Sequence, residues 1–155
     1  MPREPDLALI SDPDPADVTA LHDLLSEFNA TTTGIDDGRM FAIWLRAPSG
    51  AIAGGCCGWT WGGTCYVDTL FLPPALRRRG LGSRILAMVE STARARGCSQ
   101  IVLQTHDFQA PAFYERLGFA RTAATPEYPR GHAHLTMVKP LPQATLAVRR
   151  QLAQE

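Results

Sequence analysis

A short basic stretch rich in glycine is the part of this sequence most able to do chemistry. Residues 77–84 read RRRGLGSR, so three arginines lead directly into Gly80 and Gly82. Residues 81–96 have the spacing of an amphipathic helix, and the first amides of a helix have no partner within it. Arginine charge and glycines beside such amides let the backbone approach a bulky anion. The stretch predicts a phosphate or pyrophosphate site, and an ordinary exposed turn is the alternative.

Two familiar phosphate-binding loops do not match this stretch. A Walker loop requires lysine followed by serine or threonine after its glycines, and the only lysine of the chain is Lys139. A dinucleotide-binding fingerprint requires a third glycine, but residues 83–85 are serine, arginine and isoleucine. What remains is the pattern Arg-x-x-Gly-x-Gly, formed by Arg77, Gly80 and Gly82 at the start of a helix.

Composition and charge limit what the chain can be. Its 155 residues, with a hydrophobic content of 45%, fit one globular domain. The 15 Lys and Arg residues balance 15 Asp and Glu residues, so no overall basicity indicates a nucleic-acid partner. No apolar stretch approaches the length of a membrane span, and the first residues lack the apolar region of a signal peptide. We therefore expect a cytoplasmic protein with no membrane partner.

The cysteines and histidines do not predict a metal site. Cys56, Cys57, Cys65 and Cys98 have no zinc-finger or CxxC spacing, and the adjacent pair suits a disulfide poorly. We expect reduced, small core residues, with a catalytic cysteine as the alternative. No two histidines have the HExxH spacing of a metal-binding helix, so we expect no metal.

The periodicity of apolar residues predicts a mixed α/β fold. Residues 81–96 form the clearest helix, with apolar residues four apart from Leu81 to Ala93 and Gly97 at the end. A capping aspartate followed by proline at 14–15 starts an earlier helix. Strands are expected at 7–10, 40–46, 51–61, 64–72, 100–105, 119–125 and 134–141, and helices at 15–29, 81–96, 110–117 and 143–155. We expect one domain over residues 1–142, followed by a helical tail over 143–155.

A second segment, residues 106–119, gives the basic stretch a context. It reads HDFQAPAFYERLGF. The two segments together resemble motifs A and B of the GNAT N-acetyltransferase superfamily, and the resemblance spans about residues 7–140. Motif A is matched by Leu70, Leu72, Arg77, Gly80 and Gly82, and motif B by Ala110, Phe113, Tyr114, Gly118 and Phe119. Asp107 stands where the family usually has asparagine, and it could still cap the following helix.

The resemblance implies a fold and an acyl donor. The fold is a GNAT-like central mixed sheet of about six to seven strands, splayed in the middle and flanked by about four helices. The donor is acetyl-CoA, with its pyrophosphate on the amides from Arg78 to Ser83 and its pantetheine arm beside residues 70–72. The cofactor-binding residues implied are Leu70, Phe71, Leu72, Arg77, Arg78, Arg79, Gly80, Leu81, Gly82, Ser83, Asp107, Ala110 and Phe113.

Tyr114 is the candidate acid for this chemistry. Acetyl transfer to an amine requires a neutral amine, a stabilised thioester oxygen and a proton for the departing thiolate. A tyrosine hydroxyl that faces the cofactor can supply that proton. The alternative is a core tyrosine whose hydroxyl is bonded locally.

Asp68 is the candidate base, acting through a water molecule. It precedes Leu70 by two residues, so strand alternation predicts that the two side chains share a face of the sheet. The alternative is a solvated or hydrogen-bonded strand aspartate. His106, His132 and His134 could also accept a proton, although each is more commonly a loop or surface residue.

The acceptor site is expected at the same end of the sheet. Trp59 and Tyr66 could form an apolar wall there, or pack on neighbouring strands. The loop 127–132 resembles a tyrosine-proline-glycine-histidine loop of a subgroup of the family, which would bring Tyr128 and His132 to the acceptor. Together with the loop 29–39, these segments contain no basic cluster for an anionic acceptor beyond Arg39 and Arg130, so we expect a small primary amine or a peptide amine.

A rival interpretation is a non-catalytic acyl-CoA-binding or interaction module on the same fold. The presence of Tyr114 and Asp68 favours the enzyme, whereas Asp107 in place of asparagine leaves the rival open. A weak apolar stripe along the tail 143–155 predicts that the tail packs on its own domain or on a second copy of the chain, and we expect a homodimer.

Overall fold

The computed structural model describes residues 5–142, and the predicted helical tail over 143–155 lies outside the described residues. The chain divides into two compact units, one up to Asp36 and one from Asp37 onward. The expectation of one domain over residues 1–142 stays a prediction.

The first unit contains one helix, α1 (Pro15–Thr33). Asp14 caps it as expected, because its side chain accepts a 2.8 Å hydrogen bond from the Ala16 N–H. Gly34 ends it in the left-handed conformation, with φ 71°, and the helix is four residues longer than expected. The predicted strand at 7–10 is wrong, since these residues have no regular structure. A short apolar run forms a strand only where a neighbouring strand takes up its backbone hydrogen bonds.

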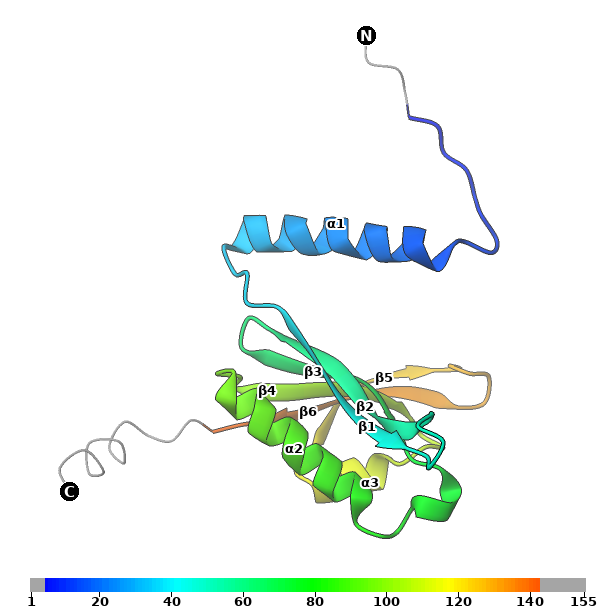
Figure 1. Cartoon of the computed structure of the whole chain (residues 1–155), viewed down its shortest axis with the longest axis vertical. Helices are drawn as coiled ribbons and strands as arrows, with labels where there is room; N and C mark the ends of the chain where they lie inside the picture. The colour runs from blue at the N-terminus through cyan, green and yellow to red at the C-terminus, as the bar shows by residue number, and fades with distance from the viewer. Residues whose placement is uncertain (1–4, 143–155) are drawn as a thin grey trace, which may run out of the picture. The chain divides into compact units, whose positions relative to one another are not determined.

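The second unit is built on a six-stranded mixed sheet, in agreement with the predicted fold (Figure 1). The strands lie side by side in the order β1-β2-β3-β4-β6-β5. The strands are β1 (Arg39–Arg46), β2 (Ile52–Trp61), β3 (Thr64–Phe71), β4 (Gln100–His106), β5 (Ala120–Pro126) and β6 (Ala133–Pro140). The β3–β4 pair is parallel, and the other four neighbouring pairs are antiparallel.

The sheet opens between its two parallel strands. Residues Thr64 to Val67 of β3 pair with Gln100 to Leu103 of β4, and the pairing ends there. β3 continues to Phe71 and β4 continues to His106 without further pairing between them. The expected splay in the middle of the sheet is therefore confirmed, and it leaves a gap beyond Val67 and Leu103.

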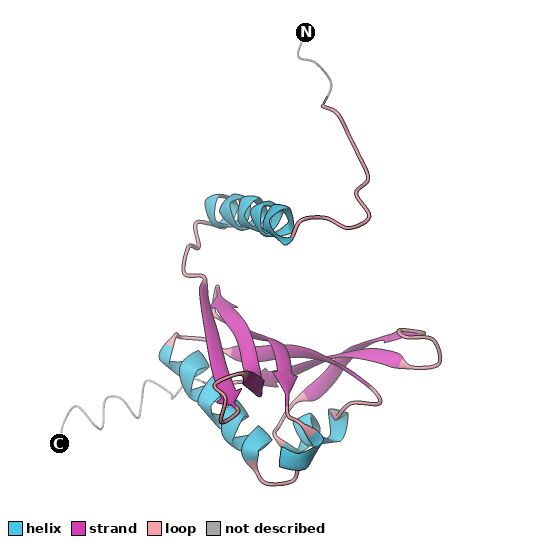
Figure 2. Cartoon of the chain, turned by 45° about the vertical axis from the view of Figure 1, so that its right-hand side comes forward, coloured by secondary structure: helices cyan, strands magenta, loops and turns pink. Residues whose placement is uncertain are grey.

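Helices α2 (Leu81–Ala95) and α3 (Pro111–Arg116) lie on the same side of this sheet (Figure 1 and Figure 2). A single turn of 3₁₀ helix, η1 (Pro74–Leu76), precedes α2. The described residues thus contain three of the four α-helices expected, and the fourth was assigned to the tail. The predicted apolar stripe of α2 supplies the core, in which Ile85, Leu86, Val89 and Ala93 are buried with Ile101, Leu103 and Met137.

The cysteines are free, and three of them are core residues. Cys56, Cys65 and Cys98 are buried and Cys57 is half-buried. Burial raises the pKa of Cys56 and of Cys65 to about 12, so neither is a thiolate near neutral pH. In the described part of the chain, no three His, Cys, Asp or Glu side chains are grouped so that they could hold a metal ion. Among residues 5–142, none of the helices combines the length and hydrophobicity that a membrane crossing requires.

Candidate functional site

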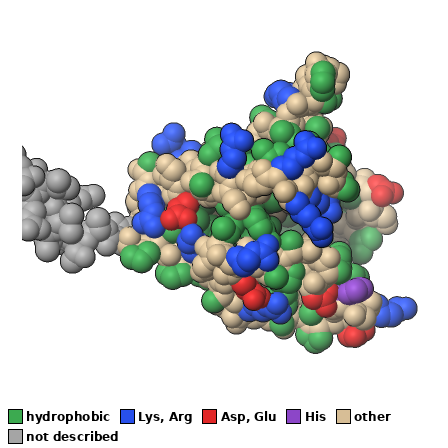
Figure 3. Space-filling view, turned by 90° about the horizontal axis from the view of Figure 1, so that it is seen from below, with side chains coloured by type: hydrophobic (Ala, Val, Ile, Leu, Met, Phe, Trp, Pro, Cys, Tyr) green, Lys and Arg blue, Asp and Glu red, His purple; other side chains and the backbone are tan. Residues whose placement is uncertain are grey.

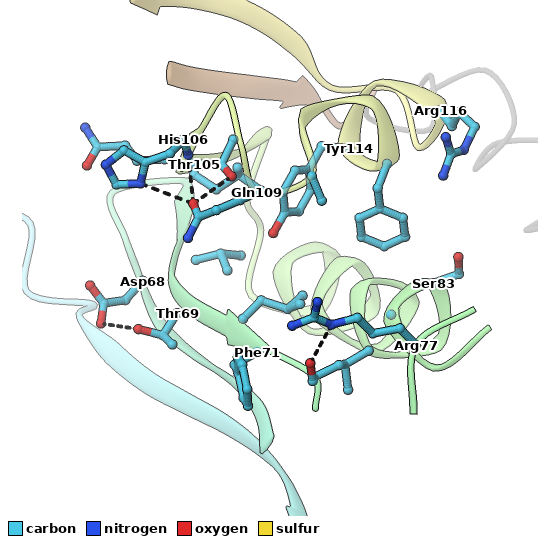
Figure 4. Close-up of a pocket in the computed structure, with 18 of the residues that line it drawn as sticks. Asp68, Thr69, Phe71, Arg77, Ser83, Thr105, His106, Gln109, Tyr114 and Arg116 are labelled. Atoms are coloured by element: carbon cyan, nitrogen blue, oxygen red, sulfur yellow. Dashed lines mark hydrogen bonds between the residues drawn. The ribbon is translucent and has the colours of Figure 1, made fainter. Parts of the chain in front are cut away.

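The gap between β3 and β4 is the mouth of a cavity of about 1080 Å³ (Figure 4). In the space-filling view, Arg and Lys side chains surround a hollow with a hydrophobic floor (Figure 3). The sequence-predicted site residues that line the cavity are Tyr66, Asp68, Leu70, Phe71, Leu72, Arg77, Arg78, Gly80, Gly82, Ser83, Ala110, Phe113 and Tyr114. The predicted site residues that do not line it are Trp59, Arg79, Leu81, Asp107, Tyr128 and His132.

The cavity is lined from both faces of the sheet. Along β4, Ile101, Leu103 and Thr105 are buried, and the first two belong to the core with α2. Strand alternation therefore turns Gln104 and His106 toward the opposite face. Phe113 and Tyr114 reach the cavity from α3, on the helix side of the sheet. In Figure 4, Asp68 and His106 lie well away from Ser83 and Arg116. Two reactants can thus approach each other from opposite faces.

The start of α2 offers free backbone donors to the cavity. Gly80 precedes the helix with φ 73°, a conformation that favours glycine, and no side chain caps the helix. Arg84 N–H donates to the Gly80 carbonyl at 3.1 Å, while the amides of residues 81–83 have no backbone acceptor among the described residues. A Cβ on Gly80 would meet no atom within 4 Å, so the space beside the turn is open. The turn fits an anionic group, as its sequence predicts.

Arg77 shapes this turn as well as lining the cavity. Its Nε donates a 2.8 Å hydrogen bond to the Leu72 carbonyl, which ties the end of the loop to the end of β3. Its guanidinium carbon also lies 5.9 Å from the centre of the Phe71 ring. Arg77 therefore has a structural role that the motif alone does not reveal.

Tyr114 is buried in aromatic surroundings, and its hydroxyl opens to the cavity. Its side chain is 8% exposed, with ring centres 5.2 Å from Phe113 and 5.8 Å from Phe119. No hydrogen bond to its hydroxyl is present within residues 5–142, and no fully buried polar side-chain atom there lacks a partner. The hydroxyl oxygen must then be accessible from the cavity. Burial raises the pKa of Tyr114 to about 12, so the hydroxyl keeps its proton at neutral pH.

Asp68 is the extra residue of a β-bulge. Cys57 on β2 pairs with Thr69 and Gly58 pairs with Val67, so Asp68 has no partner. The bulge breaks the alternation that predicted a shared face for Asp68 and Leu70. Cys65 and Val67 face the core before the bulge, and Leu70 packs on it afterwards. Asp68 is exposed, lines the cavity and accepts a hydrogen bond from the Thr69 hydroxyl at 3.3 Å.

Asp107 holds the loop 127–132 instead of capping a helix. Its Oδ1 lies 3.0 Å from Nδ1 of His132, and its Oδ2 accepts a 3.0 Å hydrogen bond from the Ala133 N–H. The residue before α3 is Ala110, and no side chain caps that helix. The expectation that Asp107 caps α3 is therefore wrong, because both carboxylate oxygens are used on the chain that enters β6.

Aromatic rings gather where the sheet meets this loop. Trp59 stacks on Tyr66, with ring centres 4.6 Å apart, and the Tyr66 hydroxyl donates to Gln104 Oε1 at 3.1 Å. Burial, with a smaller contribution from the Asp68 charge, raises the pKa of Tyr66. Tyr128 contacts His106 and His134 at ring-centre distances of 5.5 and 4.9 Å. Trp59 and Tyr128 thus do not line the cavity, but they contact residues that do.

Gln109 is a cavity residue that the sequence did not indicate. Its Oε1 lies 2.7 Å from the His106 backbone nitrogen, 3.1 Å from the Thr105 hydroxyl and 3.2 Å from His106 Nδ1. The dashed lines in Figure 4 converge on this oxygen. The contact depends on the turn after β4, in which the Gln109 N–H donates to the His106 carbonyl. A glutamine three residues after a histidine is too common for the spacing to be a signal.

Comparison with known proteins gives a consistent family. Residues 8–119 match the family model of the GNAT acetyltransferases. A blasticidin-S acetyltransferase from Streptomyces morookaense is 39% identical over 107 residues, covering 66% of this chain and 76% of that protein. An acetyltransferase from Agrobacterium fabrum is 37% identical over 102 residues, covering 66% of this chain and 74% of that protein.

A solved structure extends the agreement over nearly the whole described chain. A crystal structure of an acetyltransferase from Agrobacterium tumefaciens superposes with a TM-score of 0.79 at 31% identity. The match covers 88% of this chain and 99% of that one. The splayed sheet and the glycine turn at the start of α2 are features that the family resemblance predicts. The chain belongs to the GNAT family and is an acetyltransferase.

Proposed function

We propose that this acetyltransferase moves the acetyl group of acetyl-CoA to a primary amine of a small molecule. The observation that carries the proposal is the cavity at the splay, to which the Tyr114 hydroxyl opens from the helix side and His106 contributes from the other face. The relative from Streptomyces is named after a compound and not after a protein, which supports a small acceptor.

The residues at the helix side suit the donor. The free amides of residues 81–83 and the arginines Arg77 and Arg78 would hold the pyrophosphate. The unpaired edge of β3 from Asp68 to Phe71 would take the pantetheine arm through backbone hydrogen bonds. Acetyl-CoA supplies a thioester, which an amine can cleave by direct attack.

Tyr114 and Asp68 have separate roles in the proposed reaction. The Tyr114 hydroxyl, protonated at neutral pH because burial raises its pKa, donates a proton to the departing thiolate. The Asp68 carboxylate attracts the ammonium group of the acceptor and can act on it through a water molecule. Holding both reactants in one cleft supplies much of the rate enhancement.

Incubation with acetyl-CoA and a panel of amines tests the proposal. The panel should contain polyamines, amino acids, aminoglycosides and aminonucleosides, with hydroxyl and anionic compounds as matched controls. We expect at least one amine to gain an acetyl group, read by mass spectrometry and by release of free thiol. A panel in which only hydroxyl or anionic compounds are acetylated would refute the amine acceptor.

We also propose that the enzyme is a cytoplasmic homodimer. The four described cysteines are free, as expected in a reducing compartment. The dimer was inferred from the tail 143–155, and light scattering on the full chain tests it. A monomer at high protein concentration would refute the dimer.

A further inference from the structure

The contacts of Gln109 determine which nitrogen of His106 carries a proton. The His106 backbone N–H can only donate, so the atom 2.7 Å away on Gln109 must be its amide oxygen. The same oxygen lies 3.2 Å from His106 Nδ1. Because an oxygen acceptor faces Nδ1, that nitrogen must carry a hydrogen. A neutral His106 therefore has its lone pair on Nε2.

The surroundings of His106 hold its ring in place and leave Nε2 free. The Phe108 ring stacks on the His106 ring with an interplanar angle of 17°. The ring centre of His134, on the paired strand β6, lies 4.7 Å from the ring centre of His106. Within residues 5–142, no group forms a hydrogen bond with Nε2. His106 lines the cavity on the face opposite the helices. A neutral His106 thus offers a free lone pair, on a ring held in place, to this side of the cavity.

We propose that His106, through Nε2, accepts the proton that the acceptor ammonium must lose before it attacks the thioester. This role rests on the proposed function and deepens it. Histidine side chains in peptides titrate near ~6.5 and aspartate side chains near ~3.9, so an imidazole is the stronger base of the two. Asp68, across the gap on β3, then serves to attract the ammonium and to stabilise the imidazolium.

The proton and electron balance of the step is complete. The ammonium gives one proton to His106 Nε2, and the lone pair left on the nitrogen forms a bond with the thioester carbonyl carbon. The C–S bond breaks with its electron pair on sulfur, which takes the Tyr114 proton. The second proton lost by the nitrogen restores the Tyr114 hydroxyl, and His106 releases its proton to water.

Several titratable groups face His106, and a test must distinguish their contributions to the pH dependence from that of His106. His134 lies beside it on β6 and Tyr128 on the loop, and both contact its ring. Asp68 and Tyr66 line the same cavity from β3. The Asp107–His132 pair lies next to the ring of Phe108.

The test is the pH dependence of kcat/KM for an acetylated amine from the panel. The parent should lose activity toward low pH, as the base becomes protonated. His106→Asn should lower kcat/KM at pH 7 by about 10²- to 10⁴-fold and abolish this acid limb, apart from the dependence due to the amine itself. Gln109→Glu should move the limb to higher pH, because a carboxylate opposite Nδ1 stabilises the imidazolium. A merely structural role would lower the rate at every pH and leave the limb in place.

His134→Asn and Asp68→Asn are the matched variants. Both should keep the limb, whatever their rates. A limb that persists in His106→Asn and disappears in Asp68→Asn would overturn the role of His106 while leaving amine acetylation intact. A parent that acetylates no amine would overturn the proposed function itself. A thermal shift with acetyl-CoA checks that each variant is folded, and Gln109→Glu decides the matter if His106→Asn does not fold.

Discussion

The ring of Phe113 occupies the space that a side chain on Gly82 would need. A Cβ built on Gly82 would lie 2.9 Å from Phe113 Cζ, closer than real Cβ contacts come. Glycine at 82 thus lets the ring from α3 approach the first turn of α2. Glycine is therefore needed at positions 80 and 82 for different reasons. Gly80 is required by its backbone conformation, with φ 73°, and a Cβ there would meet only open space. From the sequence alone, both glycines are explained by one requirement, the close approach of a phosphate group to the backbone.

Gly82→Ala should weaken acetyl-CoA binding by displacing the Phe113 ring. We expect a several-fold rise in Kd and a loss of about 1 kcal/mol in the free energy of unfolding, typical of mild overpacking. Calorimetry and urea unfolding measure the two effects. In a Phe113→Leu background the alanine should be neutral or stabilising, since alanine favours a helix over glycine by up to ~1 kcal/mol. If the losses in the free energy of unfolding simply add in the double variant, contact with the Phe113 ring is not the reason why Gly82→Ala destabilises the protein.

Tyr114→Phe should reduce turnover and spare binding. The substitution removes the hydroxyl but keeps the ring contacts with Phe113 and Phe119. We expect kcat to fall on the order of ten- to a thousandfold, with the Kd for acetyl-CoA nearly unchanged. Steady-state kinetics with calorimetry checks both. Unchanged turnover would make Tyr114 a core residue with no part in proton transfer.

Stability should fall at alkaline pH because buried thiols resist ionisation. Burial raises the pKa of Cys56 and Cys65 from 9.0 to about 12. Above pH 9 the unfolded chain releases these protons while the native state keeps them, so the free energy of unfolding decreases between pH 9 and 12. It is unaffected by these thiols below pH 9. Each raised thiol contributes up to about 1.4 kcal/mol per pH unit in that window.

Urea unfolding under reducing conditions at pH 7, 8.5 and 10 measures this decline. Cys56→Ala and Cys65→Ala should each flatten it. Cys57→Ala, at a half-buried position on the same strand as Cys56, is the control and should flatten the decline least, because the Cys57 charge adds less than burial to the raised pKa of Cys56. An equal decline in all three variants would contradict the assignment to the buried thiols.

The regular part of the fold follows from periodicity and caps. The stripe from Leu81 to Ala93 predicts α2, and Gly97, with φ 76°, follows its last turn as expected. The splay is not a consequence of periodicity, and it is expected only because the two motifs resemble those of the GNAT superfamily. Residues 7–10 show the limit of this reasoning, because an apolar run does not reveal whether another strand will pair with it.

The irregular parts of the site could be predicted only in outline. The glycines that interrupt the strand 51–61 predict a bulge or close packing, and the structure has both at Gly58, where a Cβ would collide with the Tyr66 carbonyl. A period of two along β3 does not show that Asp68 is the residue left unpaired. The roles of Gln109 and Asp107 likewise arise from a turn and from a loop 25 residues away, which only the folded chain brings together.

Asp107→Asn should affect the acceptor and not the donor. Asp107 does not line the cavity, and its two oxygens hold His132 and the Ala133 amide at the end of the loop 127–132. An asparagine offers one oxygen and one N–H₂ group, so it keeps one of the two bonds and weakens the other. The loop carries Tyr128, whose ring contacts His106 and His134 at the cavity. We expect KM for the amine to rise several-fold, with the Kd for acetyl-CoA unchanged, and His132→Asn should reproduce the effect. The family resemblance implies the opposite, a cofactor role in which asparagine strengthens acetyl-CoA binding, and calorimetry on Asp107→Asn distinguishes the two outcomes.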